Sequence, residues 1–199
     1  PGAQMQAGAP RSLFEVLARL AAESGHVAAS LDDVHRGSGG LSARLTYGEL
    51  HAAAARLAGA VGTCLEAGGG GAAVATRMRR GNEWYAVFFA AAKLQVPLVA
   101  LSVDLPDKAA ENGRNAEILS EHRPLLLITD GPDPGGAPAE LGCSSARAVA
   151  ISELWALAEK HDARAPVPGD VEAPQLRAVG AALTPDATLC FCYTAGTTD

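Results

Sequence analysis

Residues 72–101 read AAVATRMRRGNEWYAVFFAAAKLQVPLVAL, and this stretch decides the fold class. The runs 72–78 and 96–101 are short and apolar, as strands buried in a parallel sheet are. Between them, residues 83–94 are expected to form a helix that is apolar nearly all round, which indicates burial on several sides, and Asn82 is expected to cap it. A strand, a helix and a strand at this spacing predict a βαβ unit, and hence a parallel sheet in an α/β fold.

The segment before this unit carries the clearest local signal, because residues 45–50 read LTYGEL. Thr46 and Glu49 have the spacing of a capping box, and the leucines on either side have the spacing of a hydrophobic staple. An apolar stripe at helical spacing follows. The glycines at 68–71 then end the predicted helix.

The rest of the chain also alternates between predicted helices and predicted strands. We expect helices over 12–23, 109–121 and 152–160, with Ser12 and Ser152 as caps, and strands over 27–31, 125–129, 148–151 and 188–193. Ile118 and Leu119 are expected to face the core. Residues 1–11 are expected to be a disordered tail, and residues 162–186, with four prolines, a surface linker.

Composition and charge exclude several functional classes. The net charge is -6 and the 16 basic residues are scattered, so we expect no nucleic-acid partner. No apolar run reaches the roughly 18 residues that a transmembrane segment needs. The five histidines are dispersed, and no metal site is predicted. Arg79 and Arg80 are expected to lie in a solvated turn rather than an anion site.

The four cysteines form no Cys-x-x-Cys pair and are interpreted as free thiols in a reducing compartment. Cys190 and Cys192 would share one face of a strand, a poor geometry for bridging. A cytoplasmic location is therefore expected. Organelle targeting is left open, because the chain does not begin with Met.

The segment with a chemical character is residues 193–199, which read YTAGTTD after the last predicted strand. A glycine among small hydroxylic residues exposes backbone N–H groups, and such a nest can hold a polyphosphate. Composition alone would also allow an ordinary turn.

This segment resembles the phosphate loop of the adenylate-forming superfamily, which comprises acyl-CoA synthetases, nonribosomal-peptide adenylation domains and luciferases. The family motif runs YTSGTTG, and five of the seven positions match here. Ala195 replaces the usual Ser and Asp199 the usual Gly. Residues 45–50, 92–106 and 116–130 also resemble family segments, in the family's order, so residues 12–199 are interpreted as part of the large N-terminal domain of an adenylate-forming (AMP-binding) enzyme, truncated in the phosphate loop.

The resemblance implies a function and a set of ligands. In this family a carboxylate attacks the α-phosphorus of ATP, and the acyl-adenylate then passes its acyl group to the thiol of CoA or of a pantetheinyl carrier. The expected cofactors are ATP, Mg²⁺ and CoA or such a carrier. By position, the ATP phosphates would be held by the loop residues Thr194, Ala195, Gly196, Thr197 and Thr198. No catalytic residue is assigned.

The same resemblance leaves alternatives open. The expected partners are a small-molecule carboxylate and a missing C-terminal part of the same enzyme, without which the chain is expected to be inactive and prone to aggregation. Within the family, a CoA ligase and a carrier-loading enzyme are not separated. A non-catalytic truncated homologue that acts as a binding or scaffold module is a further alternative. Outside the family, the alternative is an unrelated α/β nucleotide- or phosphosugar-binding domain.

Overall fold

The computed structural model describes residues 12–23, 27–30, 41, 44–67, 73–131, 141, 146–162 and 188–193. Three predictions therefore fall outside the described residues. They concern the disordered tail, nearly all of the surface linker, and the structure of the phosphate loop.

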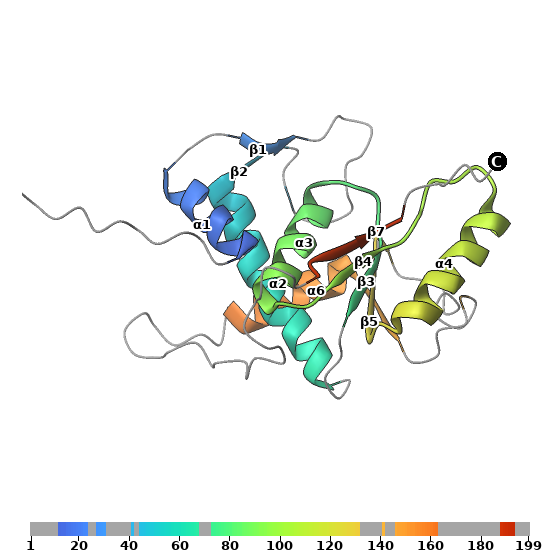
Figure 1. Ribbon diagram of the computed structural model, residues 1–199. Coiled ribbons are helices and arrows are strands. Elements are labelled where there is room, and N and C mark those ends of the chain that lie inside the picture. The colour runs from blue at the N-terminus through green and yellow to red at the C-terminus, as the bar shows by residue number, and fades with distance from the viewer. Residues whose placement is uncertain are drawn as a thin grey trace, which may run out of the picture.

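A parallel sheet lies at the centre of the described chain (Figure 1). Its strands, in spatial order β6-β5-β3-β4-β7, are Arg147–Ala150, Leu126–Thr129, Val74–Arg77, Leu98–Ala100 and Cys190–Cys192. In the register of the sheet, Val74 of β3 pairs with Leu98 of β4 on one side and with Leu126 of β5 on the other. The α/β class and the parallel pair at 72–101 are thus confirmed, with strands a few residues shorter than predicted.

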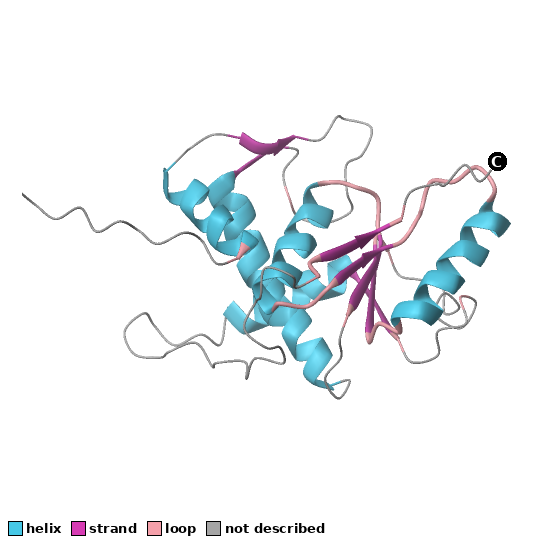
Figure 2. Ribbon diagram, viewed as in Figure 1, coloured by secondary structure: helices cyan, strands magenta, loops and turns pink. Residues whose placement is uncertain are grey.

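Helices cover both faces of this sheet (Figure 2). On one face, strand residues such as Val74, Leu98 and Ile128 belong to a core shared with α2 (Tyr47–Ala67), α3 (Asn82–Leu94) and α6 (Ile151–Asp162). On the other face, Ala75, Val99 and Leu127 pack with Ile118 and Leu119 of α4 (Lys108–His122). The alternation follows from the strand period of two, since successive side chains point to opposite faces.

The N-terminal segment lies outside the sheet. Helix α1 (Leu13–Glu23) packs against α2 and α3, and its first turn is capped as predicted, because the Glu15 N–H donates to Ser12 Oγ at 3.1 Å. Strand β1 (Val27–Ser30) pairs antiparallel with β2 (Arg44–Thr46). The sequence predicted the first of these strands but not its partner.

The capping box at the start of α2 is present with both of its hydrogen bonds. The Glu49 N–H donates to Thr46 Oγ1 at 3.2 Å, and the Thr46 N–H donates to Glu49 Oε2 at 2.8 Å. These bonds hold the pKa of Glu49 below its usual value. Two of the otherwise unpaired donors at a helix start are thereby satisfied.

Two predicted caps are wrong. Gly81 is the N-cap residue of α3 and makes no side-chain bond, whereas Asn82 is already helical and is 2% exposed. Its side chain is therefore buried. Helix α6 begins at Ile151, so Ser152 lies inside the helix and is exposed.

Candidate functional site

The carboxyl ends of β3 and β4 define a crevice in the sheet. The two strands are neighbours, but the chain leaves β3 toward α3 on one face and leaves β4 toward α4 on the other. Loops that diverge in this way open a space between them, and in open α/β sheets ligands bind at this switch point. Since β7 runs parallel to β4, its carboxyl end lies at the same edge.

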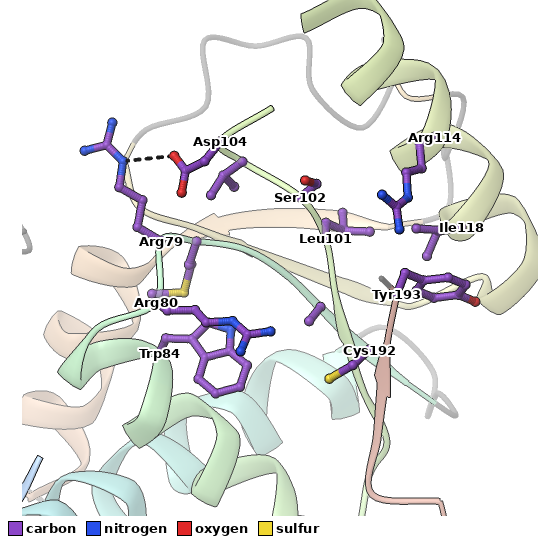
Figure 3. A pocket seen from close by; sticks show the side chains of 13 residues that line it. Arg79, Arg80, Trp84, Leu101, Ser102, Asp104, Arg114, Ile118, Cys192 and Tyr193 are labelled. Atoms are coloured by element: carbon purple, nitrogen blue, oxygen red, sulfur yellow. Dashed lines mark ion pairs between the residues drawn. The ribbon is translucent and has the colours of Figure 1, made fainter. Parts of the chain in front are cut away.

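A cavity of about 380 Å³ occupies this position (Figure 3). It is lined by the segments that follow β3 and β4, by α4, and by the end of β7. The residues are Met78, Arg79, Arg80, Trp84, Ala100, Leu101, Ser102, Val103, Asp104, Arg114, Ile118, Cys192 and Tyr193. The residues predicted to bind phosphate follow Tyr193 directly, so the chain enters that segment from the wall of the cavity.

Three arginines line the cavity. The Arg80 guanidinium lies over the Trp84 ring, 5.3 Å from its centroid, and Figure 3 shows Arg114 on the opposite side. Arg79 Nε lies 3.8 Å from Asp104 Oδ1, but both side chains are largely exposed, and such a pair adds little stability. Arg79 and Arg80 are solvated, as expected from the sequence. They nevertheless contribute positive charge to the cavity, which favours an anionic ligand.

The loop after β4 forms one wall of the cavity and is fixed by Asn115 of α4. Its amide accepts a hydrogen bond from the Ser102 N–H at 3.0 Å and donates to the Ser102 carbonyl at 2.8 Å. Asn115 is fully buried. A side-chain amide that pairs with both backbone groups of one residue replaces a strand partner, so this loop stays ordered after the sheet ends.

Glu111, also on α4, fixes the next part of this loop. Its buried carboxylate accepts from the Leu105 N–H at 2.8 Å and from Lys108 Nζ at 2.9 Å. Burial alone would raise the pKa of Glu111, but the bonds from Leu105 and Lys108 and the charge of Arg77 outweigh it and lower the pKa. The carboxylate is therefore ionised at neutral pH and acts as a structural anchor.

A further carboxylate joins the ends of β3 and β5. Asp130 Oδ2 accepts from the Arg79 N–H at 2.9 Å. Burial raises the pKa of Asp130, the bond and charge of Arg79 oppose the increase, and Asp104 adds to it. The contact fixes the backbone from which Arg79 and Arg80 extend.

The end of β7 is held by side chains of α4. The His122 ring lies 4.1 Å from the Phe191 ring between centroids, and His122 Nε2 is hydrogen-bonded to the Tyr193 hydroxyl. The same hydroxyl donates to Glu121 Oε2 at 3.1 Å, and partial burial together with this carboxylate raises the pKa of Tyr193. The last described residue of the chain is thus held in place beside the cavity.

A second groove, of about 610 Å³, lies between α1, α2 and α3. Its lining among the described residues is aliphatic or aromatic, for example Leu17, Tyr85 and Phe88. It offers no charged group to a reacting centre, so the cavity at the switch point is the better candidate site.

The structure tests the predicted site only at its border. Thr194, Ala195, Gly196, Thr197 and Thr198 lie outside the described residues, and their role stays a prediction. Sequence reasoning missed the supports in α4, namely Glu111, Asn115 and His122. A helical wheel could have placed Glu111, Asn115 and Ile118 on one face, but it could not have named their partners.

No helix in the described part of the chain is long and apolar enough to cross a membrane. The same residues contain no group of three or more His, Cys, Asp or Glu side chains that could hold a metal ion. The three described cysteines, Cys64, Cys190 and Cys192, are free thiols.

Comparison with known proteins identifies the family. The family model described as "AMP-binding enzyme" matches residues 19–198. No curated protein matches the chain significantly.

Solved structures with the same fold include VinN with 3-methylaspartate (TM-score 0.60, 20% identity, 94% of this chain, 44% of that one). O-succinylbenzoate coenzyme A synthetase from Bacillus subtilis with AMP gives a TM-score of 0.57 and 21% identity over 94% of this chain and 39% of that one. The NpsA N-terminal subdomain from Klebsiella oxytoca with 3-hydroxybenzoyl-AMSN gives a TM-score of 0.57 and 18% identity over 95% of this chain and 39% of that one. The chain therefore spans less than half the length of these structures.

Proposed function

Because this chain belongs to the AMP-binding enzyme family, we propose that it is the N-terminal part of an ATP-dependent ligase that activates a carboxylate as an acyl-adenylate and then forms a thioester. The observation that carries the proposal is the family match, which includes residues 193–198. The position of β7 supports it, because the strand ends in the wall of the switch-point cavity directly before this segment in the sequence.

In this proposal the loop Thr194–Thr198 binds the β- and γ-phosphates of ATP. Backbone N–H groups around Gly196 and the threonine hydroxyls are suitable donors for phosphate oxygens. Arg80 and Arg114 line the cavity in which β7 ends and give it positive charge, which favours an anionic ligand. Mg²⁺ bound to the triphosphate would neutralise charge on the departing pyrophosphate.

The reaction divides into two steps. A carboxylate oxygen of the substrate attacks the α-phosphorus, a new P–O bond forms, and the bond to pyrophosphate breaks with the electron pair leaving on pyrophosphate. The loop contributes by holding donors where the leaving oxygens gain charge. A thiol then displaces AMP from the acyl carbon.

The thiol acceptor is proposed to be CoA. O-succinylbenzoate coenzyme A synthetase is one of the similar structures, but so is NpsA-ThdA, an artificial fusion of an adenylation domain with a carrier domain. A pantetheinyl carrier is therefore the second candidate acceptor. The partner of the site is a small carboxylate in either case, and the reduced thiols among the described residues suit a cytoplasmic location.

Two residues of the loop depart from the family pattern. Ala195 offers a backbone N–H but no hydroxyl, and Asp199 places a carboxylate next to the phosphate-binding segment. Like charges repel, so we expect Asp199→Gly to tighten ATP binding. An unchanged or weaker affinity in that variant would show that the Asp199 carboxylate points away from the nucleotide or binds it through Mg²⁺.

The chain alone is proposed to lack adenylation activity and to bind ATP no more tightly than the millimolar range. A few hydrogen bonds to phosphate contribute about 1.5–3 kcal/mol each, whereas association costs at least about 4 kcal/mol. Titration calorimetry of residues 1–199 with ATP and Mg²⁺ tests this. Micromolar binding would contradict it.

The function is tested by ATP–pyrophosphate exchange. The chain is produced together with any coding sequence that follows it in the same reading frame, and it is assayed against a panel of aliphatic, aromatic and amino-acid carboxylates. We expect exchange that depends on one class of carboxylate. Absence of exchange across the panel, in a protein that is folded by circular dichroism, would favour the non-catalytic binding module.

A further inference from the structure

The thiols of Cys190 and Cys192 face each other at the edge of the candidate site. Their Sγ atoms lie 3.5 Å apart in a hydrogen bond. Cys190 is half-buried, and Cys192 is exposed and lines the cavity. Two residues apart on β7, they share one face of the strand, as expected from the sequence.

We propose that this pair is a chelating dithiol site for a trivalent arsenical, which two thiols are enough to bind. The proposal is independent of the proposed ligase activity.

The separation of the sulfurs suits chelation. With bonds of about 2.3 Å from each sulfur to the bound atom, the length found for zinc–sulfur bonds, sulfurs 3.5 Å apart subtend an angle of about 100° at that atom. Neither the strand nor its pairing with β4 has to change for both thiolates to bind one centre.

The same separation disfavours a disulfide. The sulfurs would have to close from 3.5 Å to about 2.0 Å, and the Cα atoms of residues two apart on a strand lie about 6.8 Å apart, at the outer limit for a bridge. Bridging would bend β7 at Phe191, where it pairs with Val99 of β4. The expected poor bridging geometry agrees with this arrangement.

The surroundings provide access to the pair. Cys192 is exposed, so it is the thiol that meets a reagent first, and the half-buried Cys190 closes the chelate. The cavity provides room for the third substituent of the bound arsenic, and the Trp84 ring gives it an apolar surface against which an aryl substituent can pack.

The reaction with phenylarsine oxide is balanced without electron transfer. Two S–H bonds and the arsenic–oxygen bond break, two As–S bonds form, and the oxygen leaves as water with both protons. No oxidant or reductant is needed.

The experiment is a titration of the chain with phenylarsine oxide, followed by intact mass. We expect one adduct per chain, which the dithiol 2,3-dimercaptopropanol removes and an equal thiol concentration of 2-mercaptoethanol does not. Cys190→Ser and Cys192→Ser should each weaken binding by roughly 100-fold or more, because the second bond of a chelate is intramolecular. Cys64→Ser is the control, since Cys64 is buried in the core and should not matter.

Three results would overturn the proposal. In the first, Cys190→Ser binds as tightly as the unchanged chain, which means that Cys192 reacts alone. In the second, both single variants keep full affinity, which places the adduct elsewhere. The removal test uses the unchanged chain, so it decides the matter even if a serine variant fails to fold. In the third, 2-mercaptoethanol removes the adduct from the unchanged chain, which excludes chelation by two thiols.

Discussion

The two walls of the candidate site are built differently, although one helix supports both. The loop after β4 is held by the side chains of Glu111 and Asn115, which are both 0% exposed. The end of β7 is held by His122 and Tyr193 near the surface, and Tyr193 is 39% exposed. Buried hydrogen bonds cost much to break, whereas exposed ones are replaced by water.

The difference indicates a division of roles. The β4 loop is a fixed wall, because opening it would leave polar groups in the protein interior without hydrogen-bond partners. The end of β7, at the edge of the described sheet, can shift without that cost. The segment that we propose to hold ATP thus starts from the more adaptable of the two walls.

The largest effect is expected for Asn115→Ala. The variant leaves the Ser102 N–H and carbonyl without their partner and should lower the free energy of unfolding by about 2–4 kcal/mol. Urea unfolding measures it, with the exposed Ser120→Ala on the same helix as control. A loss below about 0.5 kcal/mol would show that the β4 loop is not a fixed wall.

Glu111→Gln should have the next largest effect, about 1–2 kcal/mol at neutral pH. Glutamine can still accept from Leu105, but it no longer offers a charge to Lys108. The pKa of Glu111 is lowered in the folded state from its ordinary value of 4.5. Its contribution is therefore fully present above pH 4.5 and is lost as the pH falls through the folded pKa.

Unfolding of the chain and of Glu111→Gln across this pH range checks the prediction. The stability difference should shrink as the solution becomes more acidic. The exposed Glu117→Gln on the same helix is the control. A difference that is constant with pH would mean that the carboxylate charge plays no part.

A smaller effect, about 1 kcal/mol, is expected for His122→Ala, which removes the ring contact with Phe191. His122→Phe is the matched variant, because it keeps a ring there and loses the bond to Tyr193. If His122→Ala proved as costly as Asn115→Ala, the two walls would be equally rigid and the comparison would fail.

The smallest effect is expected for Tyr193→Phe, below about 0.5 kcal/mol, since its hydrogen bonds are exposed. Thermal unfolding measures it, with Tyr85→Phe, at a similar exposure of 41%, as control. A large drop in melting temperature for the Tyr193 variant alone would make the end of β7 a structural anchor.

Local patterns in the sequence predicted the parts of this fold that depend on nearby residues. The capping box at Thr46 and Glu49 joins residues three apart, and the βαβ unit at 72–101 follows from hydrophobic runs of suitable length. The resemblance of residues 193–199 to a phosphate loop rested on the residues themselves and pointed to the family that the family model confirms.

The parts that were missed depend on contacts distant in sequence or on chain direction. Glu111 and Asn115 are polar, so the pattern of apolar residues did not mark them as buried. Their burial follows from the β4 loop folding back over α4. Asn82 was a plausible cap by residue type, but the backbone turns one residue earlier, at Gly81. Cys190 and Cys192 were placed on one face correctly, yet how near their sulfurs lie depends on side-chain rotamers that a sequence does not specify.

The most direct test of the central claim is ATP–pyrophosphate exchange by the double variant Thr197→Val and Thr198→Val, with Ser120→Ala as control, in the chain joined to any sequence that follows it in frame. If these threonines hold the phosphates of ATP, the exchange rate should fall by roughly 100-fold or more, while the control keeps the rate of the unchanged protein. Exchange at an undiminished rate in the double variant would contradict the assignment of this segment as the phosphate loop.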